Sequence, residues 1–330
     1  PGDPAGPPQQ PEGVAFPLPD PLPPECVPRS PADPGAGLRP GPDPLQGWLG
    51  ATGKGEGQFT YPRALAVSRE GHLYVVDKTG RIQKFDPDGR LLRSARTPAI
   101  DQGMPTCLSI APSGDLLVAD THYCRVLTYS PDLELRGAFG VPGLAPGRFL
   151  LLTGVYQTSD GRIYTTDYGD YEARLQVFDR EGKHLAAIGT FGTGDAELRR
   201  PMSVCVDEAA GRVYVADAVN HRIAVFGRDA TWIEALAGPE VLRFPYSIVQ
   251  DEAGRLWVAE FGGHRVSVLD PRSGAVLGRF GQPGRALGQL SNPWGVVPAP
   301  GGRVWLLDSG NDRVYALPRA AILGAQGEPG

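Results

Sequence analysis

The stretch ADAVNHRIAVF, residues 216–226, places four polar side chains within six residues, a density typical of catalytic or metal sites: Asp217, Asn220, His221 and Arg222. The pattern recurs along the chain, as in VVDKTGRIQKF (75–85) and VAEFGGHRVSVL (258–269). An acid holds the same position in six copies: Asp77, Asp120, Asp167, Asp217, Glu260 and Asp308. An arginine follows in each copy: Arg81, Arg125, Arg174, Arg222, Arg265 and Arg313. The acids are 43 to 50 residues apart, which indicates a repeat architecture.

Recurrence changes the interpretation of these polar residues. A carboxylate that ends one strand and a guanidinium that begins the next can pair across the connecting loop. His221 shares its position with Cys124, His264 and Asp312, and a catalytic residue would not be so interchangeable. We therefore predict a structural role for the six pairs, with no catalytic residue, metal site or cofactor among them.

Each repeat contains four short apolar segments, for example SVCVD (203–207), RVYVAD (212–217), RIAVF (222–226) and WIEALAG (232–238). Four short strands per unit, joined by turns rich in Gly and Pro, are typical of a propeller blade. The chain of 330 residues has 45 Gly and 34 Pro, which fits such turns. We predict an all-β, six-bladed β-propeller.

The spacing of glycines indicates how the ring closes. A glycine at the end of a fourth strand precedes the next blade by twelve residues, as in Gly189 to Pro201 and Gly281 to Pro293. Gly50 and Pro62 have the same spacing, so LQGWLG (45–50) is expected to complete blade six. Residues 44–324 would form the propeller and residues 325–330 a C-terminal tail. The Pro-rich residues 1–43 are predicted to be a disordered tether.

The linkers LGATGKGEGQFTYP (49–62) and FGQPGRALGQLSNP (280–293), together with the acid and the arginine of each repeat, resemble the NHL-repeat family of six-bladed propellers. The resemblance implies a ligand site on the face that carries the loops between the second and third strands and the start of each first strand. Nine residues are expected to line this funnel: Arg63, His122, Tyr123, Tyr168, Arg200, Met202, Tyr246, Phe261 and Trp294. Tyr, Trp and Arg are typical of recognition surfaces.

Some six-bladed propellers that this chain resembles are enzymes. The amidating-lyase and streptogramin-lyase types use channel histidines, and gluconolactonase-like enzymes use an acidic calcium site. The chain has five histidines, of which only His122 lies in a suitable loop, and one histidine cannot build a three-ligand zinc site. We expect a non-catalytic module that binds a protein, a peptide or a glycan. A metal-dependent lyase or hydrolase is the alternative.

Composition limits the partners and the location. The net charge of −5, without lysine clusters, counts against nucleic acid. No apolar run is long enough for a membrane helix. Four cysteines without CxxC spacing imply neither a zinc cluster nor a disulfide framework: Cys26, Cys107, Cys124 and Cys205. We expect an extracytoplasmic monomer, either secreted or periplasmic, or tethered to a membrane by a segment upstream of Pro1.

Overall fold

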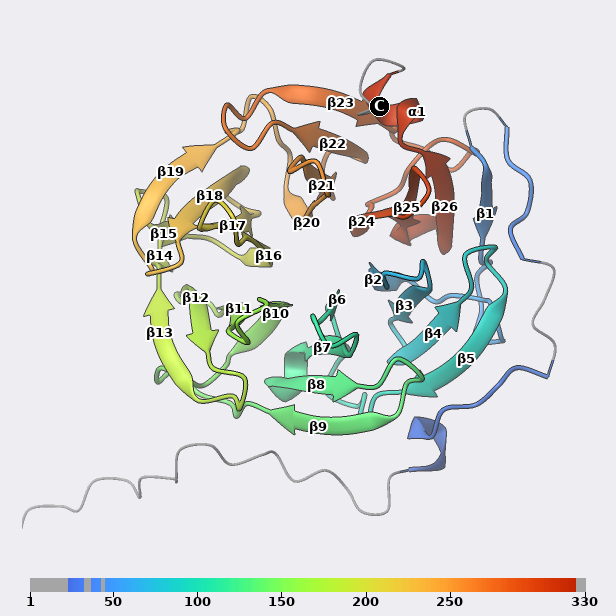
Figure 1. Ribbon diagram of the computed structural model, residues 1–330, viewed down its shortest axis with the longest axis horizontal. Coiled ribbons are helices and arrows are strands. Elements are labelled where there is room, and N and C mark those ends of the chain that lie inside the picture. Colours follow the sequence, from blue (N-terminus) through green and yellow to red (C-terminus); the bar gives the residue numbers. More distant parts are fainter. Residues whose placement is uncertain (1–22, 33–36, 43–44, 325–330) are drawn as a thin grey trace, which may run out of the picture.

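The computed structural model describes residues 23–32, 37–42 and 45–324. Figure 1 shows a closed ring of six blades around a central axis, each blade a four-stranded antiparallel sheet. Blade one is β2 (Pro62–Val67), β3 (Leu73–Asp77), β4 (Arg81–Phe85) and β5 (Leu91–Arg96). Blade two is β6 (Cys107–Ile110), β7 (Leu116–Asp120), β8 (Arg125–Tyr129) and β9 (Leu135–Phe139). Blade three is β10 (Leu151–Gln157), β11 (Ile163–Tyr168), β12 (Ala173–Phe178) and β13 (His184–Ile188).

The other half of the ring follows the same order. Blade four is β16 (Pro201–Asp207), β17 (Arg212–Asp217), β18 (Arg222–Gly227) and β19 (Trp232–Leu236). Blade five is β20 (Pro245–Gln250), β21 (Leu256–Glu260), β22 (Arg265–Leu269) and β23 (Val276–Phe280). Blade six is β24 (Gly295–Ala299), β25 (Arg303–Asp308), β26 (Arg313–Pro318) and β1 (Gly47–Leu49). The short elements are β14 (Thr190–Phe191), β15 (Glu197–Leu198), η1 (Pro24–Cys26), η2 (Thr121–Tyr123), η3 (Ser309–Asn311) and α1 (Ala320–Leu323).

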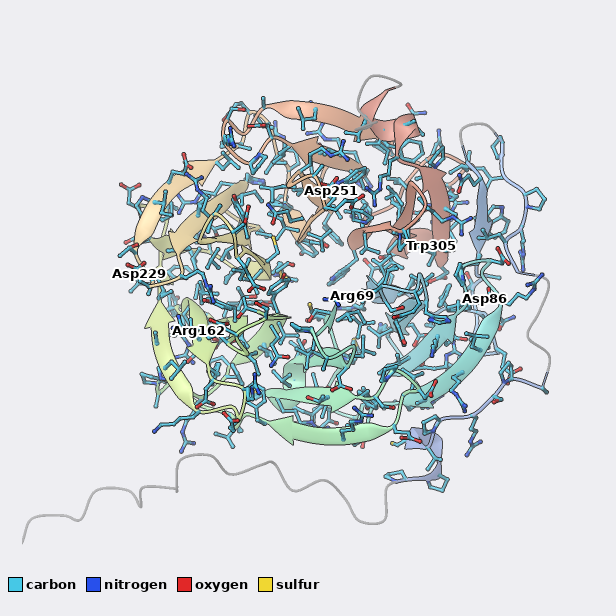
Figure 2. All side chains as sticks on the ribbon, in the orientation of Figure 1. Arg69, Asp86, Arg162, Asp229, Asp251 and Trp305 are labelled. Atoms are coloured by element: carbon cyan, nitrogen blue, oxygen red, sulfur yellow. The ribbon has the colours of Figure 1, made fainter. Side chains whose placement is uncertain are left out.

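The second strands of most blades have nearly continuous apolar sequences because both of their faces are covered by neighbouring blades. Every residue of β3 and of β21 is buried. Trp257 and Trp305 are completely buried, and side chains fill the space between the blades (Figure 2). Stacked sheets bury apolar area on both sides, and this burial is the main term that stabilises the ring. The predicted all-β, six-bladed propeller is confirmed.

Blade six combines strands from two distant parts of the chain. β1 pairs antiparallel with β26, with Gly47 opposite Ala316 and Leu49 opposite Val314. Leu49 and Leu45 are each 4% exposed, and both pack into the cores that blade six shares with its neighbours. The segment that the glycine spacing assigned to blade six therefore lies in that sheet.

The described part of the Pro-rich segment lies against blade one and β1. Arg29 bridges Ser94 on the outer strand β5, Leu38 donates its N–H to the Asp88 carbonyl, and Arg39 bridges Trp48. Cys26 is 1% exposed. We call residues 23–32 and 37–42 the arm. The sequence predicted a disordered tether over 1–43, whereas the arm is bonded to blade one and β1. β5 is an outer strand, and its free backbone groups can pair with an extended segment. The rest of the predicted tether, and the tail 325–330, lie outside the described residues.

The six acid–arginine pairs form in the structure and hold the linkers between blades. Each acid is buried, and the shortest nitrogen–oxygen distances run from 2.7 Å for Arg313 to 3.1 Å for Arg174. The acid also accepts a linker N–H in five blades, as when Asp217 accepts from Arg199 at 2.7 Å. Arg222 donates onward to the Glu197 carbonyl at 2.6 Å. The pair satisfies linker backbone groups that would otherwise be buried without partners.

Candidate ligand site at the channel mouth

The six innermost strands β2, β6, β10, β16, β20 and β24 surround a central channel of about 130 Å³. Its lining is dominated by aliphatic side chains such as Leu65, Leu108 and Ile248. Each first strand begins at the same end of the channel, which places Arg63 and Trp294 at its mouth. A second depression of about 340 Å³ opens beside the mouth, between blades six and one, and shares these two residues.

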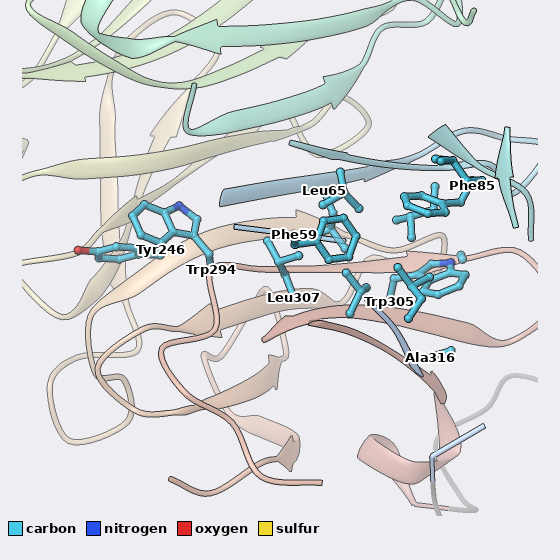
Figure 3. Packing of buried hydrophobic residues seen from close by; sticks show 14 of the residues in the cluster. Phe59, Leu65, Phe85, Tyr246, Trp294, Trp305, Leu307 and Ala316 are labelled. Atoms are coloured by element: carbon cyan, nitrogen blue, oxygen red, sulfur yellow. The ribbon is translucent and has the colours of Figure 1, made fainter. Parts of the chain in front are cut away.

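Four aromatic rings from three blades pack together at this mouth. Tyr246 stacks on Phe261 with 4.3 Å between ring centroids, and Trp294 meets both rings edge to face, at 5.0 and 5.5 Å. Tyr61 lies at 5.9 Å from Trp294 in the same geometry. Figure 3 shows Tyr246 beside Trp294. Such pairs add to the stability that burial alone provides, so the rings form a rigid platform.

Two arginines complete the cluster. The guanidinium of Arg63 lies 4.4 Å from the Trp294 ring centroid and 5.5 Å from that of Tyr61. The guanidinium of Arg200 lies 5.4 Å from the Tyr168 ring and 5.7 Å from the Tyr246 ring. We call the seven residues the mouth cluster: Tyr61, Arg63, Tyr168, Arg200, Tyr246, Phe261 and Trp294. They come from blades one, three, four, five and six, so the cluster spans most of the ring.

The arginines of the mouth cluster have no acidic partner among the described residues. The Nε atom of Arg63 is buried without a hydrogen-bond partner in this part of the chain. Burial lowers the pKa of Arg63; nearby tyrosines oppose this effect, and the charge of Arg200 adds to it. Burial also raises the pKa of Tyr246. The mouth therefore holds two positive charges in a partly dry, aromatic setting, where a ligand anion would be bound strongly.

Backbone geometry positions part of this cluster. Tyr61 and Arg200 each precede a strand-starting proline and have positive φ, 48° and 55°. Phe244 and Asn292 hold the same position in blades five and six, with φ of 49° and 48°. Bulky residues seldom adopt this conformation, and such strain is often found at functional sites. Tyr61 was missed from the sequence, although its place before Pro62, matching Arg200 before Pro201, could have pointed to it.

Two of the nine predicted funnel residues lie elsewhere, His122 and Tyr123. Met202 follows Pro201 as Arg63 follows Pro62; it is 3% exposed, lines the channel and packs in the same cluster as Tyr246 and Trp294. His122 and Tyr123 lie in η2, where the Tyr123 hydroxyl accepts the Gln102 N–H at 3.1 Å. Within the described chain, no ring or cation contact joins these two to the mouth cluster. The other six come together: Arg63, Tyr168, Arg200, Tyr246, Phe261 and Trp294.

The shared histidine position has a structural role at the joints between blades. His221 Nδ1 accepts the Phe244 N–H at 3.0 Å, and His264 Nδ1 accepts the Asn292 N–H at 3.1 Å. Asp312 does the same for Tyr61 at 2.6 Å. Each of these residues has a left-handed backbone and reaches the start of the next blade. Both an imidazole and a carboxylate can accept this backbone N–H, which explains why the position varies. Among the described residues, no three His, Cys, Asp or Glu side chains group to hold a metal ion.

Comparison with known proteins identifies the repeat. The NHL repeat family matches residues 198–226, which include most of the first three strands of blade four. The chain is 30% identical over 198 residues to mouse NHL repeat-containing protein 3, covering 54% of this chain and 56% of that protein. It is 28% identical over 144 residues to Drosophila melanogaster Protein brain tumor, covering 43% of this chain and 14% of that protein. The chain is an NHL-repeat β-propeller. It matches little more than half of the mouse relative and a small part of the fly one.

Solved structures similar to this NHL-repeat propeller share its fold. A streptogramin B lyase has a TM-score of 0.59 at 15% identity, covering 78% of this chain and 93% of that one. A gluconolactonase from Xanthomonas campestris has a TM-score of 0.60 at 16% identity, covering 79% and 86%. A chain of a nidogen–laminin complex has a TM-score of 0.53 at 17% identity, covering 66% and 79%. At these identities the likeness concerns the fold alone. In the described residues of the NHL-repeat propeller, no helix is long and apolar enough to span a membrane.

Proposed function

We propose that this propeller is a non-catalytic binding module that holds a segment of a partner protein at the mouth of its central channel. The observation that carries the proposal is the mouth cluster, in which Arg63 and Arg200 lie against aromatic rings without an acidic partner among the described residues. Aromatic residues and arginine supply contact area and directed hydrogen bonds at low entropic cost, which is typical of binding hot spots. A neutral glycan would leave both charges unbalanced.

Burial decides which variants can test this proposal. Tyr246 and Trp294 are 6% and 7% exposed and belong to a core shared by residues of blades one, four, five and six (Figure 3). Truncating either ring to alanine would cost about 3–5 kcal/mol of stability, so lost binding could simply reflect unfolding. Arg200 is exposed and Arg63 is partly exposed, so Arg63→Gln and Arg200→Gln remove charge with little loss of packing.

The test is a selection of binding peptides from a displayed library against the immobilised propeller. We expect selected peptides to bind the Arg63→Gln/Arg200→Gln variant at least about tenfold more weakly than the wild type. The matched control is Arg69→Gln. Arg69 lies beyond the far end of β2, about 20 Å from Arg63 along an extended strand. Peptides that bind the double variant and the wild type equally would refute a role for the mouth.

The enzymatic alternative is tested by metal content. A lyase or hydrolase of the amidating-lyase or gluconolactonase type needs a bound zinc or calcium ion. We expect elemental analysis of the dialysed protein to give well under one equivalent of either metal. One retained equivalent of zinc or calcium would replace the binding proposal with a metal-dependent enzyme.

The proposal includes an extracytoplasmic location, in which the Pro-rich stretch at the N-terminal end of the sequence would serve as a tether. Fractionation of cells that express the natural protein would test it. Recovery outside the cytoplasm is expected, and recovery in the cytosol alone would exclude it.

A further inference from the structure

The mouth cluster combines two features that together describe a ligand. The first is its charge. Arg63 and Arg200 approach the same group of rings, and each has several N–H donors that make no hydrogen bond to the described residues. Arginine forks match the two oxygens of a carboxylate, and a pair of them can bind one carboxylate from two sides.

The second feature is the apolar channel directly beneath. Arg63, Tyr246 and Trp294 line both the mouth and the top of the channel, so the channel begins where the charges are. Its volume is about 130 Å³. An aliphatic cavity of roughly 150 Å³ can hold a molecule of benzene, so this space suits one apolar side chain of similar size. Burying such a side chain would contribute to affinity through the hydrophobic effect.

We propose that the mouth cluster binds the C-terminus of a partner polypeptide, with the terminal carboxylate between Arg63 and Arg200 and the last side chain, apolar, in the channel. This inference rests on the proposed function and specifies its ligand. In a C-terminal residue, the carboxylate and the side chain share one carbon atom, so both can be placed at once at the boundary between charge and apolar lining. An internal Asp or Glu would satisfy the arginines but leave the channel unfilled.

The depression beside the mouth offers a path for the preceding residues. It is lined by Thr60, Tyr61, Lys78 and Asp312, together with Arg63 and Trp294. The two carboxylate oxygens of Asp312 already accept hydrogen bonds from Tyr61 and Thr52. In the depression the negative charge of Asp312 offsets the positive charge of Lys78, whereas no acidic residue among the described residues pairs with Arg200, so a ligand carboxylate is favoured on the side of Arg200. The peptide chain is thus expected to leave the mouth between blades six and one.

The experiment uses fluorescein-labelled heptapeptide pools of random sequence that end in leucine as the free acid, in leucine amide, or in glycine as the free acid. Fluorescence anisotropy with the full chain measures the affinity of each pool. We expect the leucine acid pool to bind about 10- to 100-fold more tightly than its amide, because the amide loses a charge-assisted hydrogen-bonded pair. The glycine pool should bind more weakly than the leucine acid because its terminal residue leaves the channel empty.

Variants test whether the preference for acid over amide depends on the mouth cluster. Arg63→Gln and Arg200→Gln should each remove the preference for acid over amide, whereas Arg69→Gln should keep it. Near-ultraviolet circular dichroism and the melting temperature show whether each variant is folded. Arg63→Lys keeps the positive charge but lacks the planar guanidinium, so it should retain part of the preference that Arg63→Gln loses.

Two results would overturn the inference in distinguishable ways. Equal binding of acid and amide pools, with binding still lost in Arg63→Gln, would refute the C-terminal ligand and leave the binding module standing. If no pool binds and the displayed library yields no mouth-dependent peptide, both proposals fail. If N-acetyl-leucine competes with the leucine acid pool at equal concentration, the ligand is a small acid and not a polypeptide.

Discussion

Removing β1 while keeping the rest of the propeller should open the ring at blade six. A chain that begins at Leu45 retains β1, and a chain that begins at Thr52 lacks it. Leu45 and Leu49 are each 4% exposed. Burying one leucine side chain is worth about 1.5–3 kcal/mol, so losing both costs about 3–6 kcal/mol. Typical domains are stable by about 5–15 kcal/mol, so this loss takes a large fraction of the total.

Urea unfolding followed by tryptophan fluorescence measures the difference between these two chains. With a slope of about 3 kcal/mol per molar urea, a loss of 3–6 kcal/mol lowers the midpoint by about 1–2 M. The chain without β1 also leaves β26 as an unpaired outer strand, so it should aggregate during refolding. Leu49→Ala in the full chain provides a milder form, with an expected loss of about 2–5 kcal/mol. Equal midpoints for the chains that begin at Leu45 and Thr52 would refute this account of ring closure.

Two further predictions concern blade two. Burial raises the pKa of Asp120 from 3.8 to about 6, and its Oδ1 has no partner among the described residues. A raised carboxyl pKa means that the folded state holds the proton more tightly, so the free energy of unfolding should fall by about 3 kcal/mol as pH rises from about 4 to 6. Urea midpoints across this range should lose that component in Asp120→Asn and keep it in the exposed Asp101→Asn. Gly140 has φ of +110°, and a Cβ there would lie 2.6 Å from the Phe149 ring, so Gly140→Ala should lower the melting temperature by several degrees. Gly137→Ala, where nothing lies within 4 Å, should leave it within about two degrees, and equal shifts for the two glycines would contradict the steric explanation.

The repeat could be predicted from the sequence because its signals are local. The arginine follows the acid by five residues in four of the six blades, and a linker glycine precedes the next blade by twelve residues at four of the six joints. Each spacing is set by strand length and turn geometry. The same regularity placed residues 45–50 in blade six, since Gly50 repeats the spacing of Gly189 and Gly281.

The site was harder to predict because its residues meet across the axis. The positions of residues within the repeat identified six members of the mouth cluster as candidates, but these positions could not show which rings are in contact. Tyr123 has the same residue type as three members of the cluster, yet its loop carries it and His122 away from the cluster. The contacts of the arm were also missed. Arg29 and Leu38 pair through backbone groups, and composition says nothing about where an extended backbone will find a partner.

The pairing of β1 with β26 determines how the ring would respond to mechanical tension. The two strands are antiparallel, so Gly47, where β1 begins, lies opposite Ala316, near the end of β26. Pulling the two ends of the propeller apart would load these hydrogen bonds one after another, like a zipper, and such an arrangement yields at low force. The arm lies before β1 in the chain and is bonded to blade one through Arg29 and Leu38. Tension applied upstream of the arm would have to break those bonds before it reached blade six.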